Sequence, residues 1–124
     1  MNWITLLLIT ALLVGFFLVR RLSLISPDAA VQAVKNGALV IDVRSPSEYA
    51  SGHLSGTINI PLGDLSARVG TVCPDKNRVL LLHCLSGGRS AIALGTLKSL
   101  GYSNARNLGS YSRAESILVG VQGK

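Results

Sequence analysis

Residues 78–101, RVLLLHCLSGGRSAIALGTLKSLG, join an apolar run to a helical pattern through one cysteine, two glycines and an arginine. Residues 78–84 are nearly all apolar, which is typical of a strand buried on both faces. Residues 90–101 predict a helix that ends at Gly101. This stretch therefore predicts a buried strand, a short loop that begins at Cys84, and a helix.

Helical and apolar segments alternate along the rest of the chain, so we expect an α/β fold with a small parallel sheet flanked by helices. Ligands bind such sheets outside the carboxyl ends of the strands, where Asp42 and Cys84 lie. No internal repeat or second globular domain is evident. The further helices are predicted over 26–37, 45–52, 64–72 and from 110, and the further strands over 38–43, 57–61 and 105–108.

The loop after Cys84 has the composition of an anion-binding site. Gly87 and Gly88 allow successive backbone amides to turn inward. The positive end of the helix that begins near Ser90 favours the thiolate of Cys84, and Arg89 adds a permanent charge. A buried, inert cysteine beside a glycine turn is the structural alternative. The combination of glycines, arginine and helix start favours chemistry at the sulfur.

Two motifs resemble the rhodanese family of sulfurtransferases: IDVRSPSEYASGHLSGTINIP at 41–61 and HCLSGGRS at 83–90. The resemblance covers about residues 26 to 118, and bacterial single-domain rhodaneses are the most similar in length. In that family a cysteine takes a sulfane sulfur from a donor such as thiosulfate and passes it to a thiophilic acceptor such as cyanide or a thiol.

The resemblance implies that Cys84 is the nucleophile and the persulfide carrier. Arg89 is expected to order the loop and balance its charge, and Asp42 and Arg44 to form a structural ion pair that holds the loop. A protein acceptor is an alternative to a small molecule, and neither a cofactor nor a metal is expected. The backbone amides expected to stabilise the sulfur anion belong to Leu85, Ser86, Gly87, Gly88, Arg89 and Ser90.

Two other functions remain as alternatives. Phosphatases of the cell-division dual-specificity type share the fold but have five residues between cysteine and arginine, whereas this loop has four. The second alternative is an inactive rhodanese fold, tethered to a membrane, that serves as a binding or regulatory module. The intact loop argues against this second alternative.

The remaining polar and sulfur residues favour structural roles. His53 is expected to be a satisfied turn histidine, His83 a packing residue on the side of the strand opposite Cys84. Glu48 is expected to cap its own helix with Ser45, and Cys73 is expected to be an incidental thiol. The chain departs from the family after its last strand, where Ser110 replaces a glycine and Ala114 a tryptophan.

The N-terminal segment is apolar from Trp3 to Val19 and is followed by Arg20 and Arg21. We expect residues 1–21 to form a single-pass transmembrane anchor and residues 22–124 to form the rhodanese-like domain. At about 1.5 Å per residue, residues 3–19 span about 25 Å. The two arginines favour a cytoplasmic domain, and a cleaved signal peptide with an exported, periplasmic domain is the alternative.

The net charge of +6 is spread along the chain without a basic stripe or an aromatic platform, so we do not expect a nucleic-acid partner. A modest attraction for small anions is consistent with this charge. The two cysteines are too few for the disulfide framework of a small secreted domain.

Overall fold

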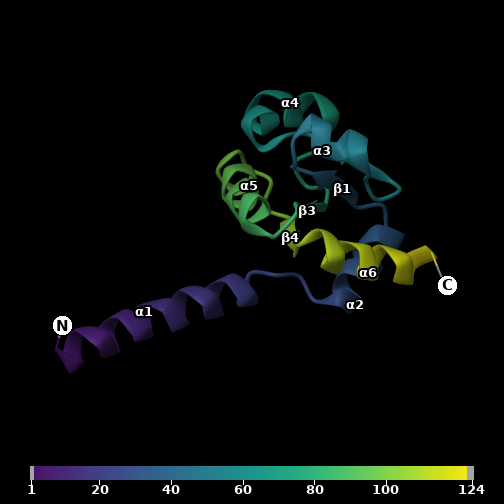
Figure 1. Cartoon of the computed structure of the whole chain (residues 1–124). Coiled ribbons are helices and arrows are strands. Elements are labelled where there is room, and N and C mark those ends of the chain that lie inside the picture. The colour runs from purple at the N-terminus through teal and green to yellow at the C-terminus, as the bar shows by residue number, and fades with distance from the viewer. Residues whose placement is uncertain (1, 123–124) are drawn as a thin grey trace.

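The computed structural model describes residues 2–122, and the side chains of residues 2–19 and 23–121. Its centre is a four-stranded parallel sheet in the order β2-β1-β3-β4, surrounded by helices (Figure 1). The strands are β1 (Leu39–Asp42), β2 (Thr57–Asn59), β3 (Leu80–His83) and β4 (Ala105–Gly109). The helices are α1 (Trp3–Leu22), α2 (Pro27–Lys35), α3 (Pro46–Ser51), α4 (Leu65–Val72), α5 (Gly88–Ser99) and α6 (Tyr111–Gln122), with a 3-10 turn η1 at Leu62–Asp64.

Side-chain caps begin the two helices whose starts were predicted from serines. The Ser26 hydroxyl accepts a hydrogen bond from the Ala29 amide at the start of α2. At the start of α3, the Ser45 hydroxyl accepts from the Glu48 amide while the Glu48 carboxylate accepts from the Ser45 amide. These three bonds satisfy amides that have no partner within the helix, so both predicted helices are confirmed.

The sheet separates two hydrophobic cores, because successive side chains of a strand point to opposite faces. On one face, Leu80 and Leu82 of β3 pack with residues of α4 and α5. On the other face, Leu81 packs with residues of α2 and α6. Continuous burial of β1 and β3 confirms the prediction of strands covered on both sides.

The predicted elements of the domain differ from the structure only near their ends. Helix α5 begins at Gly88 rather than Ser90, because Gly87 caps it with a left-handed backbone at φ +95°. A 3-10 turn precedes α4, and β2 ends two residues before Pro61. The helix predicted from residue 110 is present as α6.

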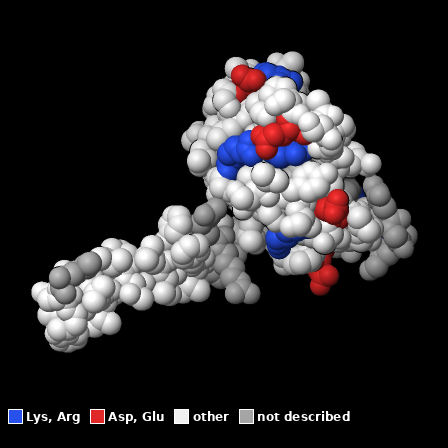
Figure 2. Space-filling model, in the orientation of Figure 1, with Lys and Arg blue, Asp and Glu red and all other residues white. Residues whose placement is uncertain are grey.

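Helix α1 extends away from the domain (Figure 1), and the visible face of its described part carries no charged side chain (Figure 2). Its apolar side chains are exposed, with Trp3 at 69% and Leu12 at 74%. Within the part of the chain that the structure describes, no helix is long and apolar enough to cross a membrane. The predicted transmembrane helix is therefore not borne out.

The predicted orientation of this segment depended on Arg20 and Arg21. Their side chains lie outside the described residues.

Candidate active site

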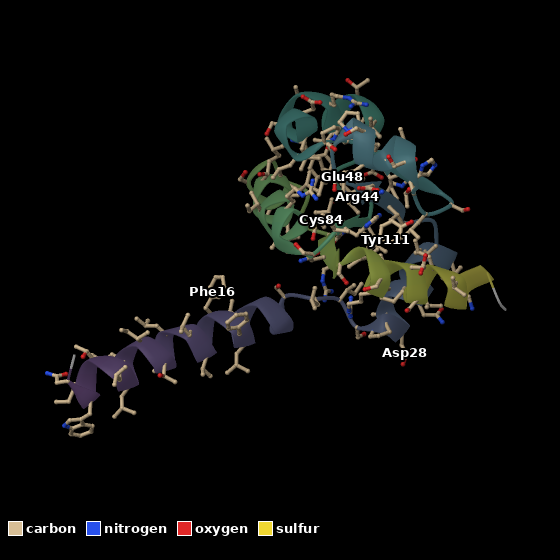
Figure 3. All side chains as sticks on the ribbon, viewed as in Figure 1. Phe16, Asp28, Arg44, Glu48, Cys84 and Tyr111 are labelled. Carbon is tan, nitrogen blue, oxygen red and sulfur yellow. The ribbon has the colours of Figure 1, made fainter. Side chains whose placement is uncertain are left out.

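The candidate site lies at the carboxyl ends of the parallel strands. Cys84 follows β3, and its amide donates to the Gly109 carbonyl at the end of β4 (3.2 Å). Asp42 is the last residue of β1 and pairs in register with His83. Parallel strands bring their carboxyl ends to one edge, so residues predicted from two separate motifs meet there. Figure 3 shows Cys84, Arg44, Glu48 and Tyr111 together in the domain, with Phe16 on α1 and Asp28 on α2 outside this group.

The loop wraps its backbone around the sulfur of Cys84. The Gly87 amide donates to Sγ at 3.0 Å and the Ser90 amide at 3.5 Å. The Ser90 hydroxyl lies 3.6 Å from Sγ. Of the amides predicted to hold the sulfur, those of Gly87 and Ser90 therefore make the direct hydrogen bonds. Gly87 reaches this position through its left-handed backbone, which side-chain-bearing residues rarely adopt.

These contacts favour the thiolate. Burial raises the pKa of the Cys84 thiol, but the hydrogen bonds of its sulfur with the amide and hydroxyl of Ser90 and with the backbone of Gly87 and Ser86 outweigh it. The pKa of Cys84 therefore lies below its ordinary value. A lowered thiol pKa is the property that makes a cysteine nucleophilic near neutral pH.

Arg89 binds a carboxylate rather than the sulfur. Its Nη1 lies 2.6 Å from Oε1 of Glu48, and its Nη2 lies 3.0 Å from Oε2. This two-pronged geometry is the strong form of an arginine–carboxylate pair. The hydrogen bonds from Arg89 and from the Ser45 amide lower the pKa of Glu48 to about 2. Arg89 thus connects the loop to α3, and its role in ordering the loop and balancing its charge stays a prediction.

Glu48 is the functional residue that sequence reasoning missed. Its capping role at α3 was predicted and is confirmed, but the pairing with Arg89 was not. The two residues are 41 positions apart, and no local pattern reports such a contact.

Asp42 and Arg44 form the predicted structural ion pair. Arg44 Nη2 lies 2.8 Å from Asp42 Oδ2 and also donates to the Gly52 carbonyl at 2.8 Å. Asp42 is fully buried, and Arg44 is 6% exposed. The Arg44 guanidinium lies over the ring of Tyr111, 4.9 Å from its centroid. The pair therefore joins the segment after β1 to the start of α6.

The two histidines have the structural surroundings that were expected. His53 stacks on Tyr49 with ring centroids 3.7 Å apart, and its Nδ1 lies 2.8 Å from the Tyr49 carbonyl oxygen. His83 is fully buried beside Tyr111, on the side of β3 away from Cys84. Burial lowers the pKa of His83, more than Asp42 raises it.

The segment after β4 covers the loop through backbone contacts. Ser86 and Ser110 form an isolated antiparallel bridge, and the Tyr111 amide donates to the Leu85 carbonyl at 3.1 Å. The bridge uses only the backbone of Ser110. Cys84 is fully buried under this cover, whereas Leu85 is 58% exposed.

The comparison with known families gives an extended match: the description "Rhodanese-like domain" fits residues 26–114. The chain belongs to the rhodanese-like family. The match covers well over half of the chain, from the cap of α2 into α6.

Curated relatives of this rhodanese-like domain include thiosulfate sulfurtransferase PspE of Escherichia coli, which is 41% identical over 69 residues. The thiosulfate:glutathione sulfurtransferase of Saccharomyces cerevisiae is 32% identical over 77 residues. These matches cover 56% and 53% of the chain, and 66% and 55% of the two relatives. The chain therefore spans less than two thirds of either relative.

A solved structure described as "rhodanese with anions from E. coli" has the same fold. It aligns with a TM-score of 0.60 at 36% identity, over 62% of this chain and 91% of that one.

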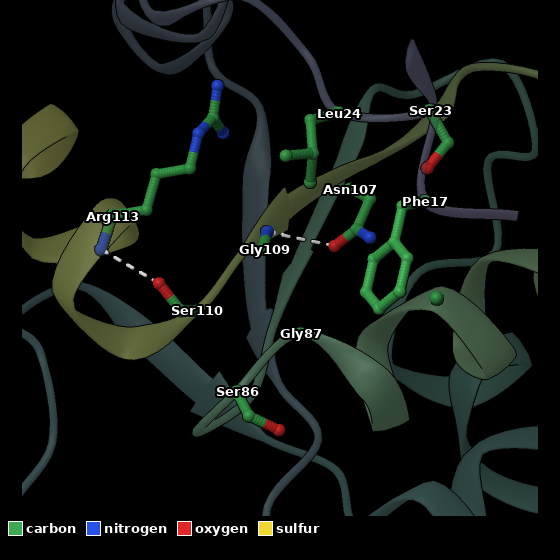
Figure 4. Close-up of a pocket in the computed structure, with 10 residues that line it drawn as sticks. Phe17, Ser23, Leu24, Ser86, Gly87, Asn107, Gly109, Ser110 and Arg113 are labelled. Carbon is green, nitrogen blue, oxygen red and sulfur yellow. Dashed lines mark hydrogen bonds between the residues drawn. The ribbon is translucent and has the colours of Figure 1, made fainter. Parts of the chain in front are cut away.

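A cavity of about 410 Å³ lies against the loop of the rhodanese-like domain (Figure 4). Ser86 and Gly87 contribute to its wall, as do Phe17 of α1 and Leu24 of the segment between α1 and α2. Cys84 does not line it, whereas Gly87, whose amide donates to Sγ, does.

Proposed function

We propose that this chain is a sulfurtransferase that carries a sulfane sulfur as a persulfide on Cys84. The observation that carries the proposal is the pair of amide hydrogen bonds from Gly87 and Ser90 to Sγ, within a loop of rhodanese length. The names of the bacterial and yeast relatives, both thiosulfate sulfurtransferases, support it.

The first step is nucleophilic attack by the Cys84 thiolate on the outer sulfur of thiosulfate. A new S–S bond forms at Sγ, the S–S bond of thiosulfate breaks, and its electron pair leaves on sulfite. The contacts that lower the pKa of Cys84 provide the thiolate. Inward-facing amides then stabilise the negative charge of the persulfide.

The second step is attack by an acceptor on the outer sulfur. The bond between the two sulfurs breaks, its electron pair returns to Sγ, and the acceptor leaves with the sulfane sulfur. Cyanide and thiols are acceptors of this chemical class, and the name of the yeast relative includes glutathione.

Access to the sulfur requires the loop to move. Cys84 is fully buried, and Leu85 and Ser86 are the exposed loop residues that follow it. A donor therefore reaches Sγ when these two residues shift away from Ser110 and Tyr111, whose backbone contacts hold them in place.

The decisive experiment is the intact mass of the full chain after incubation with thiosulfate. We expect the wild-type protein to gain the mass of one sulfur atom, and Cys84→Ser to gain none. Cys73→Ser is the matched control: Cys73 is buried and donates to the Asp75 carbonyl, away from the loop, so this variant should still be loaded. Addition of cyanide should then release thiocyanate and restore the original mass.

The competing proposal is an inactive binding module. It gains support if the folded wild-type chain takes up no sulfur from thiosulfate or from an organic persulfide, and in that case the sulfurtransferase proposal fails.

We also propose that α1 holds the domain at a lipid surface, with the domain on the cytoplasmic side. Side chains such as Trp3 and Leu12 are exposed on α1 and are the kind that lipid chains cover. The full chain should float with vesicles of phosphatidylethanolamine and phosphatidylglycerol, and Leu8→Glu with Leu12→Glu should reduce flotation. Flotation unchanged by these charges, or a C-terminal reporter active only outside the cytoplasm, would refute the proposal.

A further inference from the structure

The loop after Cys84 is anchored at both of its ends. The Cys84 amide donates to the Gly109 carbonyl at 3.2 Å, and the Gly87 amide donates to Sγ at 3.0 Å. Gly87 also lies close to the backbone at the end of β4, since a carbon added to it would be 3.6 Å from the carbonyl carbon of Gly109. Leu85 and Ser86 connect these two anchored ends. Access to the sulfur therefore depends on how firmly the residues that cover them are held.

One of the covering residues, Tyr111, is held through its ring. It is the first residue of α6, and its amide donates to the Leu85 carbonyl at 3.1 Å. The Arg44 guanidinium lies over the ring, 4.9 Å from its centroid (Figure 3). The His83 ring meets it edge to face, with centroids 5.9 Å apart. Both geometries are attractive, so the residue that binds the loop through its backbone is fixed through its side chain.

The two partners of this ring are themselves fixed. The Arg44 guanidinium donates three hydrogen bonds to the Asp42 carboxylate and one to the Gly52 carbonyl. Arg44 is only 6% exposed, and His83 is fully buried as the last residue of β3. The ring of Tyr111 is therefore attached to the sheet and its buried ion pair rather than to flexible surface groups.

We propose that Tyr111 is a positioning residue for sulfur transfer: its ring, packed on Arg44 and His83, holds the cover over the loop and sets how often reagents reach the Cys84 sulfur. This inference rests on the proposed sulfurtransferase function, in which a donor reaches Sγ when loop and cover separate. A side chain outside the loop therefore controls the rate at which the sulfur becomes accessible.

The test is alkylation of both cysteines of the full chain by iodoacetamide, with each site quantified by peptide mass. The Cys84 rates are compared at their high-pH plateau, so that a changed thiol pKa does not alter the result. Cys73 is the internal control, because it is buried at the end of α4 and becomes accessible when the domain as a whole unfolds. The rate at Cys84 relative to Cys73 therefore measures local opening of the loop.

The decisive variants change only the ring of Tyr111. Tyr111→Ala keeps the backbone amide but removes both ring contacts, so it should raise the Cys84 rate about tenfold and leave the Cys73 rate unchanged. Tyr111→Phe should react like the wild type, because the Tyr111 hydroxyl forms no hydrogen bond among the described residues. Tyr111→Leu keeps apolar bulk and should raise the Cys84 rate about threefold, which provides a second test if the alanine variant does not fold.

The matched control is Leu118→Ala on the same helix. Leu118 is buried in the core on the other side of the sheet from Cys84 and belongs to α6, so its loss weakens the packing of the helix without touching the ring of Tyr111. This variant should not raise the Cys84 rate relative to the Cys73 rate.

The same variants are then loaded with thiosulfate and followed by intact mass. Tyr111→Ala should gain its sulfur about tenfold faster than the wild type at low thiosulfate, and Tyr111→Phe at the wild-type rate. Equal rates in Tyr111→Ala and the wild type, a parallel rise at Cys73, or equal rates in Tyr111→Phe and Tyr111→Ala would overturn the positioning role. No mass gain in the wild type overturns the proposed function instead, and the alkylation rates then still decide the role of Tyr111.

Discussion

Arg89 of the sulfur loop and Glu48 of α3 form a bidentate ion pair, with Nη1 2.6 Å from Oε1 and Nη2 3.0 Å from Oε2. The pair connects the first turn of α5 to the first turn of α3. The loop around Cys84 is therefore held by a residue that lies outside the loop, in α3.

This ion pair predicts a specific loss of stability in acid. The pKa of Glu48 is lowered in the folded state from its ordinary value of 4.5 to about 2. A lowered carboxyl pKa stabilises the fold above the ordinary value, and that contribution is lost as the pH falls through the folded value. Wild-type stability should therefore decline between about pH 4.5 and 2, as followed by urea unfolding monitored by circular dichroism.

Glu48→Gln should lack this part of the pH dependence, because it cannot ionise. Glu115→Gln is the control, since Glu115 has no ion pair among the described residues. Identical pH profiles for Glu48→Gln and the wild type would contradict the prediction.

The contact between the Ser90 hydroxyl and the Cys84 sulfur leads to a prediction about the ionisation of the thiol. Ser90→Ala removes a hydrogen bond that lowers the pKa of the Cys84 thiol, so the pKa should rise. The measurement is the rate of alkylation of Cys84 by iodoacetamide as a function of pH, with the site identified by peptide mass.

Ser99→Ala is the control on the same helix, because its hydroxyl donates to the Thr96 carbonyl at the far end of α5. A midpoint that is equal in Ser90→Ala and Ser99→Ala would show that the hydroxyl does not act on the sulfur.

From the left-handed backbone of Gly87 we predict that Gly87→Ala lowers both the free energy of unfolding and the rate of persulfide loading. Alanine at this left-handed position, φ +95°, should cost at least about 1 kcal/mol in free energy of unfolding. It should also move the amide that lies 3.0 Å from Sγ, and thus slow persulfide loading about tenfold or more.

Gly95→Ala is the matched control within α5. It has no left-handed backbone and no atom within 4 Å of the added carbon. It should stabilise the protein by about 0.5–1 kcal/mol and leave loading unchanged. If Gly87→Ala and Gly95→Ala had equal free energies of unfolding and equal loading rates, the predicted role of the Gly87 backbone would be wrong.

The buried pair of Asp42 and Arg44 predicts a strong asymmetry between single and double substitutions. Asp42→Asn leaves the Arg44 guanidinium buried without its carboxylate, which should cost about 3–5 kcal/mol. The double variant Asp42→Asn with Arg44→Met should recover part of that loss, because it no longer buries an unpaired charge. The midpoint of urea unfolding measures the stability of both variants. A double variant less stable than Asp42→Asn would show that the unpaired guanidinium is not the cause of the loss.

Most of the fold could be predicted because its signals are local. The apolar run at 78–84, the caps at Ser26 and Ser45, and Gly101 after the last turn of α5 each determine an element from a few neighbouring residues. The carboxyl-end rule for parallel sheets then placed Asp42 and Cys84 together.

The contacts between distant segments could not be predicted in the same way. The pairing of Glu48 with Arg89 and the hydrogen bond from the Tyr111 amide to the Leu85 carbonyl depend on how α3 and α6 pack around the sheet. For the N-terminal segment, by contrast, a local pattern was present but was not sufficient. Its composition indicated a membrane span, but no helix among the described residues is long and apolar enough to cross a membrane.

The carboxylate of Glu48 accepts from the Ser45 amide as well as from Arg89. Aspartate at this position keeps the charge but has a side chain one carbon shorter, so it cannot meet both partners at once. At position 48 the length of the side chain is therefore needed along with its charge.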